Sequence, residues 1–201
     1  MALNPNSYPQ RMNNRIKIQK EEILSNNWYT LKKITFDYQK KDGTWTNQSR
    51  EAYDRGNGAV ILLYNTVKKT VILTRQFRLP TFINGNPDGM LIEACAGLLD
   101  KDQPDVAIKR ETEEELGYQI KDVKKIFEAY MSPGSVTEIL YFFVAEYSAK
   151  EKLNEGGGIE DEEIDVLELP FEKALSMITT GEIMDAKTIM LLYHAKIYGL
   201  L

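Results

Sequence analysis

Apolar and polar residues alternate along three segments near the start of the chain, at residues 15–24, 28–39 and 44–55. Tryptophan, tyrosine, threonine and isoleucine are frequent in these segments, and the turn sequence KKDG separates the last two. Alternation with a period of two residues and this composition favour β-strands. We therefore predict a small antiparallel sheet, preceded by a loose arm at the proline- and asparagine-rich residues 1–13.

From residue 59 onward the apolar runs become longer, which indicates the start of the main core. Two strongly apolar strands are predicted at residues 59–65 and 70–77, on either side of the turn sequence TVKK. The remaining predicted elements are strands at residues 89–97, 122–132, 137–147 and 165–170, and helices at residues 102–116, 171–183 and 185–199. The first of these helices has Pro104 near its start and Gly117 beyond its end, as helix boundaries often do.

The composition excludes several classes of function. With 43% hydrophobic and 27% charged residues it is typical of a globular protein. A net charge of −5 and the lack of a basic run argue against a general nucleic-acid or membrane-surface binder. A single cysteine, Cys95, and a single histidine, His194, exclude disulfide frameworks and Cys/His zinc sites, and we expect no chemical role for either. Catalysis, if present, must therefore depend on carboxylates.

The compartment is also suggested by what the sequence lacks. The first residues contain no apolar leader segment, and no stretch approaches the roughly 18 apolar residues of a membrane span. We therefore expect neither secretion nor membrane insertion, and the cytoplasm is the expected location.

The sequence RETEEELG, residues 110–117, contains four glutamates. On a helix, Glu111, Glu114 and Glu115 project from one side, and each like-charged pair costs roughly 0.2–0.5 kcal/mol. Glu113 faces away and is expected to be solvated. A solvated acidic face is one explanation for the cluster, but the charges lie late in the helix, where the helix dipole disfavours acids. Carboxylate oxygens are the ligands that Mg²⁺ and Mn²⁺ prefer, so a metal site explains the crowding.

A second acidic cluster lies in the loop GGGIEDEEID, residues 156–165. One interpretation is a flexible, solvated connection. The other is a mobile lid that brings Asp161, Glu162 or Glu163 to the site as a metal ligand or as the base that activates water. Glu138, after the sequence SPGSVT, is a further candidate ligand or base, although a glutamate that opens a strand is usually only exposed.

Two arginines and one tryptophan are candidates for substrate contacts. Arg75 and Arg78 lie three residues apart on a strand and point to opposite faces, so at most one of them meets a substrate directly. A surface ion pair is the alternative for either arginine. Trp28 would stack on a purine ring, although a tryptophan in a strand more often belongs to a core or an interface.

Residues 97–118 resemble the Nudix box of the Nudix hydrolases. The matching positions are Gly97, Arg110, Glu111, Glu114, Glu115 and Gly117. Gln103 stands where the family usually has glutamate, the spacer before Arg110 is one residue shorter than usual, and Thr112 occupies a usually apolar position. None of these differences affects the three glutamates that share one side of the helix.

The resemblance covers nearly the whole chain. The sequences REAYDRGNGAVILLYN, RQFR, IEACAGLLD, YMSPGSVTE, GGGIEDEEIDVLELP and TGEIMDAKT look like the GDP-mannose hydrolase branch of the sugar-nucleotide Nudix enzymes. The family implies an α/β fold, an α/β/α sandwich with a mixed sheet at residues 56–201. It also implies an N-terminal β subdomain at residues 1–55, which forms a homodimer and contributes to the partner's site. The implied activity is Mg²⁺-dependent cleavage of a nucleoside diphosphate sugar into a nucleoside monophosphate and a sugar 1-phosphate, with Mn²⁺ as an alternative ion.

The resemblance also implies roles for individual residues. The metal set it implies is the carbonyl of Ala96 with Glu111, Glu114, Glu115 and Glu162, and the catalytic acids are Glu162, Glu115 and Glu138. The implied substrate contacts are Trp28, Ser49, Arg50, Glu51, Arg78, Ala96, Gly97, Leu98, Glu115, Glu138, Asp161, Glu162 and Lys187. Among the acidic loop residues, the resemblance favours Glu162.

The leading hypothesis is hydrolysis of GDP-mannose. ADP-ribose or another nucleotide sugar is the neighbouring alternative, because nothing in the sequence alone recognises guanine. The alternative from another class is a non-catalytic nucleotide-sugar sensor that keeps the fold. The intact glutamate cluster and the acidic loop count against the sensor, because a pure binding module has no use for carboxylates that repel one another.

Overall fold

A computed structural model describes residues 13–159 and 162–201 of the chain, and these residues form two compact units. The first unit ends at Gly56 and also includes the segment Ser132–Glu138. The second unit comprises Asn57–Met131 and Ile139–Leu201. All but the last residue of the predicted N-terminal arm lies outside the described residues.

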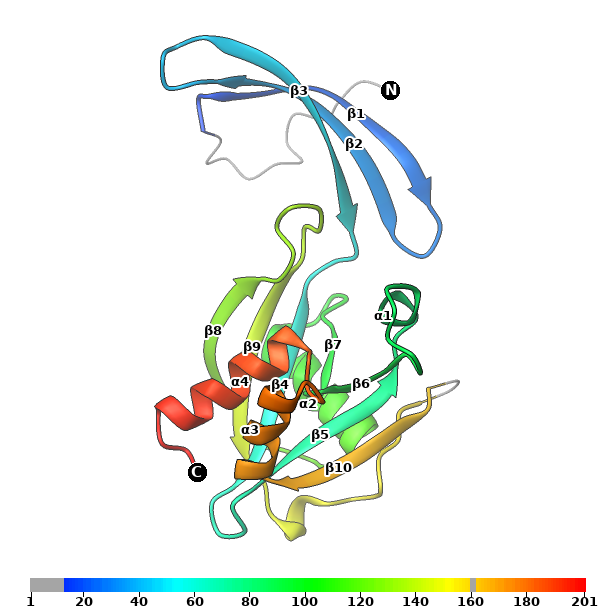
Figure 1. Cartoon of the computed structure of the whole chain (residues 1–201), viewed down its shortest axis with the longest axis vertical. Coiled ribbons are helices and arrows are strands. Elements are labelled where there is room, and N and C mark those ends of the chain that lie inside the picture. Colours follow the sequence, from blue (N-terminus) through cyan, green and yellow to red (C-terminus); the bar gives the residue numbers. More distant parts are fainter. Residues whose placement is uncertain (1–12, 160–161) are drawn as a thin grey trace. The chain divides into compact units, whose positions relative to one another are not determined.

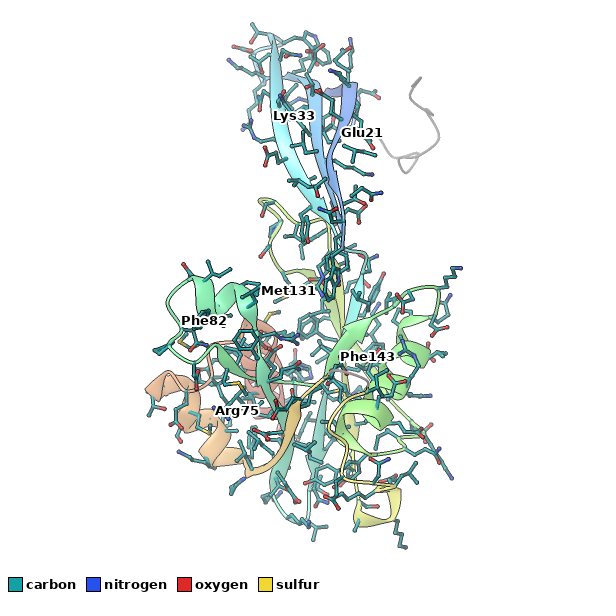
Figure 2. The ribbon with its side chains drawn as sticks, turned by 90° about the vertical axis from the view of Figure 1, so that its right-hand side faces the viewer. Glu21, Lys33, Arg75, Phe82, Met131 and Phe143 are labelled. Carbon is teal, nitrogen blue, oxygen red and sulfur yellow. The ribbon has the colours of Figure 1, made fainter. Side chains whose placement is uncertain are left out.

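The first unit is built on a three-stranded antiparallel sheet in the order β1-β2-β3. Its strands are β1 (Ile16–Asn26), β2 (Thr30–Gln39) and β3 (Trp45–Asp54), so the small antiparallel sheet is confirmed. Figure 2 shows the side chains of this sheet, with Glu21 on β1 and Lys33 on β2 labelled. No residue in these three strands is buried. The first unit therefore has strands without a core of their own.

The segment Ser132–Glu138 is attached to the last strand of this sheet. The amide N–H of Tyr53 donates to the carbonyl of Ser135 at 2.7 Å, and the N–H of Thr137 donates to the carbonyl of Tyr53 at 3.1 Å. These bonds give the edge strand β3 a partner that lies far from it in the sequence.

The second unit contains a seven-stranded sheet with the path β10-β5-β4-β9-β8, while β6 pairs with β5 and β7 pairs with β4. Its strands are β4 (Gly58–Asn65), β5 (Thr70–Phe77), β6 (Met90–Glu93), β7 (Ala96–Leu98), β8 (Lys124–Tyr130), β9 (Ile139–Glu146) and β10 (Ile164–Pro170). Its helices are α1 (Leu79–Ile83), α2 (Pro104–Leu116), the short 3-10 helix η1 (Ala149–Glu151), α3 (Phe171–Thr180) and α4 (Ala186–Ile197). Because β4 and β9 are parallel and the other pairs are antiparallel, the sheet is mixed.

Helices cover both faces of this sheet. Alternate residues of β4 enter two different cores, Val60 and Leu62 on the side of α3 and α4, and Ile61 and Leu63 on the side of α2. Figure 1 shows α3 and α4 in front of the sheet and α2 behind it, and Phe143, labelled in Figure 2, belongs to the core on the α2 side. A strand buried on both faces must be apolar throughout, which explains the uninterrupted run in β4. The predicted α/β/α sandwich is confirmed.

The prediction of one strand at residues 89–97 is wrong, because the chain changes partners within it. β6 ends at Glu93 beside β5, and β7 begins at Ala96 beside β4. Between them, the N–H of Ala94 donates to Oγ1 of Thr188 on α4 at 2.6 Å, and the carbonyl of Cys95 accepts from the N–H of Ile61 at 2.9 Å. Helix α1 was not predicted, because none of its five residues is buried.

Thr188 generates a stability prediction, because its hydroxyl accepts the only hydrogen bond that the structure records for the buried N–H of Ala94. Thr188→Val keeps the shape but leaves that N–H without an acceptor, so the free energy of unfolding should fall by about 1–3 kcal/mol. Urea denaturation measures it. Thr112→Val is the matched control, because Thr112 is equally buried and its hydroxyl donates to the carbonyl of Ile108, whereas no backbone N–H of the described residues is recorded as donating to it. An equal loss in both variants would contradict the prediction.

Candidate active site

Helix α2 carries the glutamate cluster. It begins at Pro104 and ends at Leu116, and Gly117 follows in the left-handed conformation with φ 75°. Such a glycine closes a helix without strain, so the predicted end is confirmed, while the start at Pro104 lies two residues later than predicted. The helix buries Ile108 and Leu116 in the core, and this fixes the direction of the other side chains. Glu113 is exposed as predicted.

Glu115 is the most deeply buried glutamate of the cluster, with 5% of its surface exposed. Its Oε2 atom is the one buried side-chain nitrogen or oxygen in the described part of the chain that has no hydrogen-bond partner. Burial raises the pKa of Glu115, a hydrogen bond from the buried thiol of Cys95 opposes the rise, and the charge of Glu111 adds to it, so that the pKa is about 7. A carboxylate in such a position is stabilised when a cation binds it.

Glu111 lies directly against strand β7. A Cβ atom at Gly97 would collide with the carboxyl group of Glu111, so only glycine lets the strand approach this close. The neighbouring residues Ala96 and Leu98 pair with Val60 and Gly58 of β4. The backbone at Gly97 therefore lies next to a carboxylate. Burial also raises the pKa of Glu111, although Arg110 opposes this.

Arg110 holds two of the glutamates in place. Its Nη1 lies 2.9 Å from Oε1 of Glu111 and 3.2 Å from Oε2 of Glu114, and its guanidinium is also 3.8 Å from Asp102. The described residues, as they are arranged here, hold no group of three or more acidic, cysteine or histidine side chains able to bind a metal. The glutamates are close to one another but are not arranged as a closed ligand set.

The glycine-rich loop packs on the end of α2. The N–H of Gly157 donates to the carbonyl of Glu115 at 2.9 Å, and that of Gly158 donates to the carbonyl of Glu114 at 3.3 Å. A Cβ atom at Gly156 would collide with the Glu115 carbonyl, and all three glycines have positive φ. The glycines let the loop backbone satisfy carbonyls at the helix end.

The loop continues from this attachment to Glu162. Oε2 of Glu162 accepts from the N–H of Ile159 at 3.1 Å, and its own N–H donates to the carbonyl of Ile159 at 3.0 Å. Its charge contributes to the raised pKa values of Glu111 and Glu115, so it lies near both. Glu163 is exposed, and Asp161 lies outside the described residues.

A second set of charges lies around Glu93, which the sequence analysis missed. Nε and Nη2 of Arg78 donate to the two carboxylate oxygens of Glu93 at 2.6 and 3.2 Å, and Nζ of Lys187 donates to Oε2. Glu93 is only 2% exposed. Burial raises the pKa of Glu93, but Lys187 and Arg78 outweigh it, so the net shift is downward. The available sequence signal was an acid inside an apolar strand, LIEACAG.

The two candidate arginines are now separated. Arg75 pairs with Asp88 at 3.2 Å and with Asp165 at 3.5 Å, and both of these acids are well exposed. The surface ion pair therefore describes Arg75. Arg78 instead has its pKa raised by Glu93, Glu115 and Asp185, which outweigh the opposing effect of burial. Arg78 thus lies among the acids of the site.

Five predicted site residues lie in the first unit. The Trp28 ring is 86% exposed, with the Tyr29 ring 6.2 Å away. Ser49, Arg50 and Glu51 are consecutive on β3, where Ser49 bonds the hydroxyl of Thr35 at 2.9 Å. The guanidinium of Arg50 donates to the Ser49 carbonyl at 2.7 Å and to Gln48 at 3.1 Å. Glu138 lies 3.6 Å from Arg55.

Within the second unit, the structure brings eight predicted residues into one region: Arg78, Ala96, Gly97, Glu111, Glu114, Glu115, Glu162 and Lys187. Leu98 lies next to Gly97 on β7. The acids suit a hard dication, and the two cations suit an oxyanion such as a phosphate. The region can therefore hold a metal ion beside a phosphorylated ligand.

The fold is similar to that of a protein of known structure. A crystal structure of an ADP compounds hydrolase superposes with a TM-score of 0.71 at 18% identity, covering 92% of this chain and 94% of that one. This likeness supports the fold alone.

The sequence itself matches two family models and closely similar relatives. Residues 15–53 match the GDP-mannose pyrophosphatase NudK N-terminal domain, and residues 54–192 match the NUDIX domain. A GDP-mannose pyrophosphatase of Enterobacter sp. (strain 638) is 57% identical over 94% of this chain and 100% of its own length. That of Escherichia coli (strain K12) is 58% identical over 91% of this chain and 96% of its own length. The chain belongs to the NUDIX family of hydrolases.

Proposed function

We propose that this protein is a Mg²⁺-dependent pyrophosphatase that hydrolyses GDP-mannose to GMP and mannose 1-phosphate. Two similar proteins, 57% and 58% identical, are named GDP-mannose pyrophosphatase, and the matches cover more than nine-tenths of the chain. The observation in the structure that carries the proposal is the buried, unpartnered carboxylate oxygen of Glu115 among further acids. A non-catalytic sensor would gain nothing from keeping this group charged.

The residues around Glu115 fit a divalent cation. Glu111 and Glu115 would hold it, with Glu114, Glu162 and the carbonyl of Ala96 as further oxygen ligands. Mg²⁺ prefers such hard oxygen ligands, and Mn²⁺ accepts them as well. When bound, the ion would neutralise charge on the diphosphate and make a water molecule more acidic. Arg110 would have to release or share Glu111 and Glu114, with which it is now paired.

The cationic side chains would bind the diphosphate. Arg78 presents a planar guanidinium and Lys187 an ammonium group, and both suit phosphate oxygens. The backbone at Gly97 adjoins Glu111. Together with Leu98 it would line the diphosphate part of the substrate. Held between cations and acids, the phosphorus atom would be oriented for attack by water.

Glu162 is the proposed base. Its charge acts on Glu111 and Glu115, and it lies on a loop whose glycines are bonded to α2, which supports a role in taking a proton from a water molecule beside them. Glu115, Glu138, Asp161 and Glu163 remain alternatives for this role.

The first unit is proposed to form a homodimer and to contribute base and ribose contacts through Trp28, Ser49, Arg50 and Glu51. The lack of any buried residue in β1, β2 and β3 and the exposed ring of Trp28 support this proposal. We also propose a cytoplasmic location, with which the buried free thiol of Cys95 is compatible. The described residues contain no helix that is long and apolar enough to cross a membrane.

A substrate panel tests the activity. We expect the purified protein to hydrolyse GDP-mannose in the presence of Mg²⁺ and not in EDTA, with products identified by chromatography. The panel should include ADP-ribose and other nucleotide sugars. Equal or better turnover of ADP-ribose would contradict the GDP-mannose assignment, and no turnover of any member would favour the sensor.

Glu115 generates a prediction that links stability to pH. With a pKa near 7 in the folded protein, against an ordinary value of 4.5, folded Glu115 binds more protons than unfolded Glu115 between these pH values. In EDTA the free energy of unfolding should therefore fall as the pH rises through this range, by about 3 kcal/mol. Glu115→Gln should remove this dependence and raise the melting temperature at pH 8, while kcat falls by orders of magnitude.

The control is Glu114→Gln, which removes a carboxylate paired with Arg110. It should give no such gain in melting temperature at pH 8. Mg²⁺ should stabilise the wild type more than Glu115→Gln. If Glu115→Gln is less stable than the wild type at pH 8 in EDTA, the buried carboxylate does not destabilise the folded protein, and the interpretation is wrong.

The proposed dimer generates a further prediction. Ile23 on β1 is 63% exposed, so it offers apolar surface that a partner subunit could cover. Ile23→Lys should shift a dimer to monomer in light scattering coupled to size exclusion, because burying a lysine at the interface is unfavourable. Val67→Lys, in the turn of the second unit and 90% exposed, should leave the dimer intact. A monomeric wild type would contradict the proposed assembly.

A further inference from the structure

Glu93 joins three elements that are distant in the sequence. It is the last residue of β6, while Arg78 follows β5 and Lys187 lies in the first turn of α4. Both cations donate to its single carboxylate, Arg78 through two nitrogen atoms. Because Glu93 is 2% exposed, its position is set by the core and not by solvent. The buried carboxylate of Glu93 therefore holds the two cations next to each other.

The network is held at a second point. Nζ of Lys187 also donates to Oδ1 of Asp185 at 2.9 Å, and Oδ2 of Asp185 accepts from the hydroxyl of Thr188 at 2.5 Å. That hydroxyl in turn accepts from the N–H of Ala94, the residue after Glu93. The two negative charges of the carboxylates balance the two positive charges of the arginine and the lysine, so the network is neutral in the absence of a ligand.

The two cations keep unused hydrogen-bond donors. A guanidinium has five N–H groups and an ammonium three. Within the described chain, Arg78 uses one Nε–H and one Nη2–H on Glu93, and Lys187 uses two of its protons on Glu93 and Asp185. The side chain of Arg78 remains 39% exposed and that of Lys187 14%. A purely structural ion pair has no need of exposed donors.

Glu93 also determines which acid Arg78 bonds. The charge of Glu115 acts on Arg78, and the charge of Arg78 acts on Glu115, so the two lie near each other. Arg78 nevertheless donates to Glu93, and Oε2 of Glu115 has no partner in the described residues. Arg78 is thus bonded to Glu93 and not to the proposed metal ligand.

We propose that Glu93 is a positioning residue for the diphosphate of the substrate, acting through Arg78 and Lys187. The inference rests on the proposed function, because it takes the substrate to be a nucleoside diphosphate sugar. Glu93 does not touch the substrate itself. Its buried carboxylate holds the two cations at a fixed separation with free N–H groups, so that they bind the diphosphate without first being reoriented.

A double-mutant cycle tests this proposal. Glu93→Gln keeps the shape but removes the charge, and KM for GDP-mannose should rise by about tenfold or more, the equivalent of one lost charge-assisted hydrogen bond. Glu93→Asp should recover part of the loss. In an Arg78→Gln background, Glu93→Gln should raise KM by a smaller factor, because the part of its effect that passes through the arginine is already lost and only the part through Lys187 remains. In an Arg75→Gln background its full effect should remain.

Glu168→Gln is the structural control. Glu168 on β10 likewise accepts hydrogen bonds from several side chains, those of Lys68, Thr70 and Tyr147. None of these is Arg78 or Lys187. Glu168→Gln should lower the melting temperature without changing KM. If Glu93→Gln changes only the melting temperature, or if its effect on KM is equal in the wild-type and Arg78→Gln backgrounds, the proposal is overturned.

Failure of the proposed function would be recognised separately. If the wild type hydrolyses no nucleotide sugar, that function is wrong, and calorimetric titration with inorganic pyrophosphate then decides the role of Glu93. Binding to the wild type that is about tenfold weaker in Glu93→Gln would support the positioning role. No binding to the wild type, or equal binding to both proteins, would overturn it.

Discussion

The burial of one carboxylate, that of Glu115, is the constraint around which the candidate site is organised. Its helix must bury Ile108 and Leu116 in the core, and this places Glu115 inside the protein as well. The Cys95 thiol offers one hydrogen bond, and Oε2 has none within the described chain. An isolated fold would avoid such a group because it costs stability. A metalloenzyme gains from it, because the carboxylate is already desolvated when the ion arrives.

Two backbone segments, β7 and the acidic loop, approach helix α2 closely because they carry glycine at the points of contact. Glycine at position 97 lets β7 lie against Glu111, and glycine at position 156 lets the acidic loop lie against the Glu115 carbonyl. The break between β6 and β7 has a related effect, because it leaves Glu93 beside β5 while Ala96 joins β4. Two groups of charge result, the glutamates of α2 and the network of Glu93. Arg78 lies between them and bonds only to the second.

Much of this arrangement was predictable from local sequence. The spacing of Glu111, Glu114 and Glu115 defined one helix face, and the apolar run of β4 required a sheet covered on both sides. Glu93 was missed because its importance depends on partners 15 and 94 residues away, and a single acid in an apolar strand has no periodic signal. The split of residues 89–97 into two strands was missed for the same reason, since the backbone at the break bonds a hydroxyl on α4 that is distant in the sequence. The packing of the acidic loop on α2 also had no local signal, because it depends on contacts between distant segments.

Binding of Mn²⁺ tests the central claim most directly, because it reports on the carboxylates without requiring a substrate. Titration followed by electron paramagnetic resonance should show binding to the wild type and to Glu113→Gln, whose glutamate is exposed. Glu115→Gln should bind Mn²⁺ at least about tenfold more weakly than the wild type, while its melting curve shows a folded protein. Equal Mn²⁺ affinity in the wild type and Glu115→Gln would contradict the account.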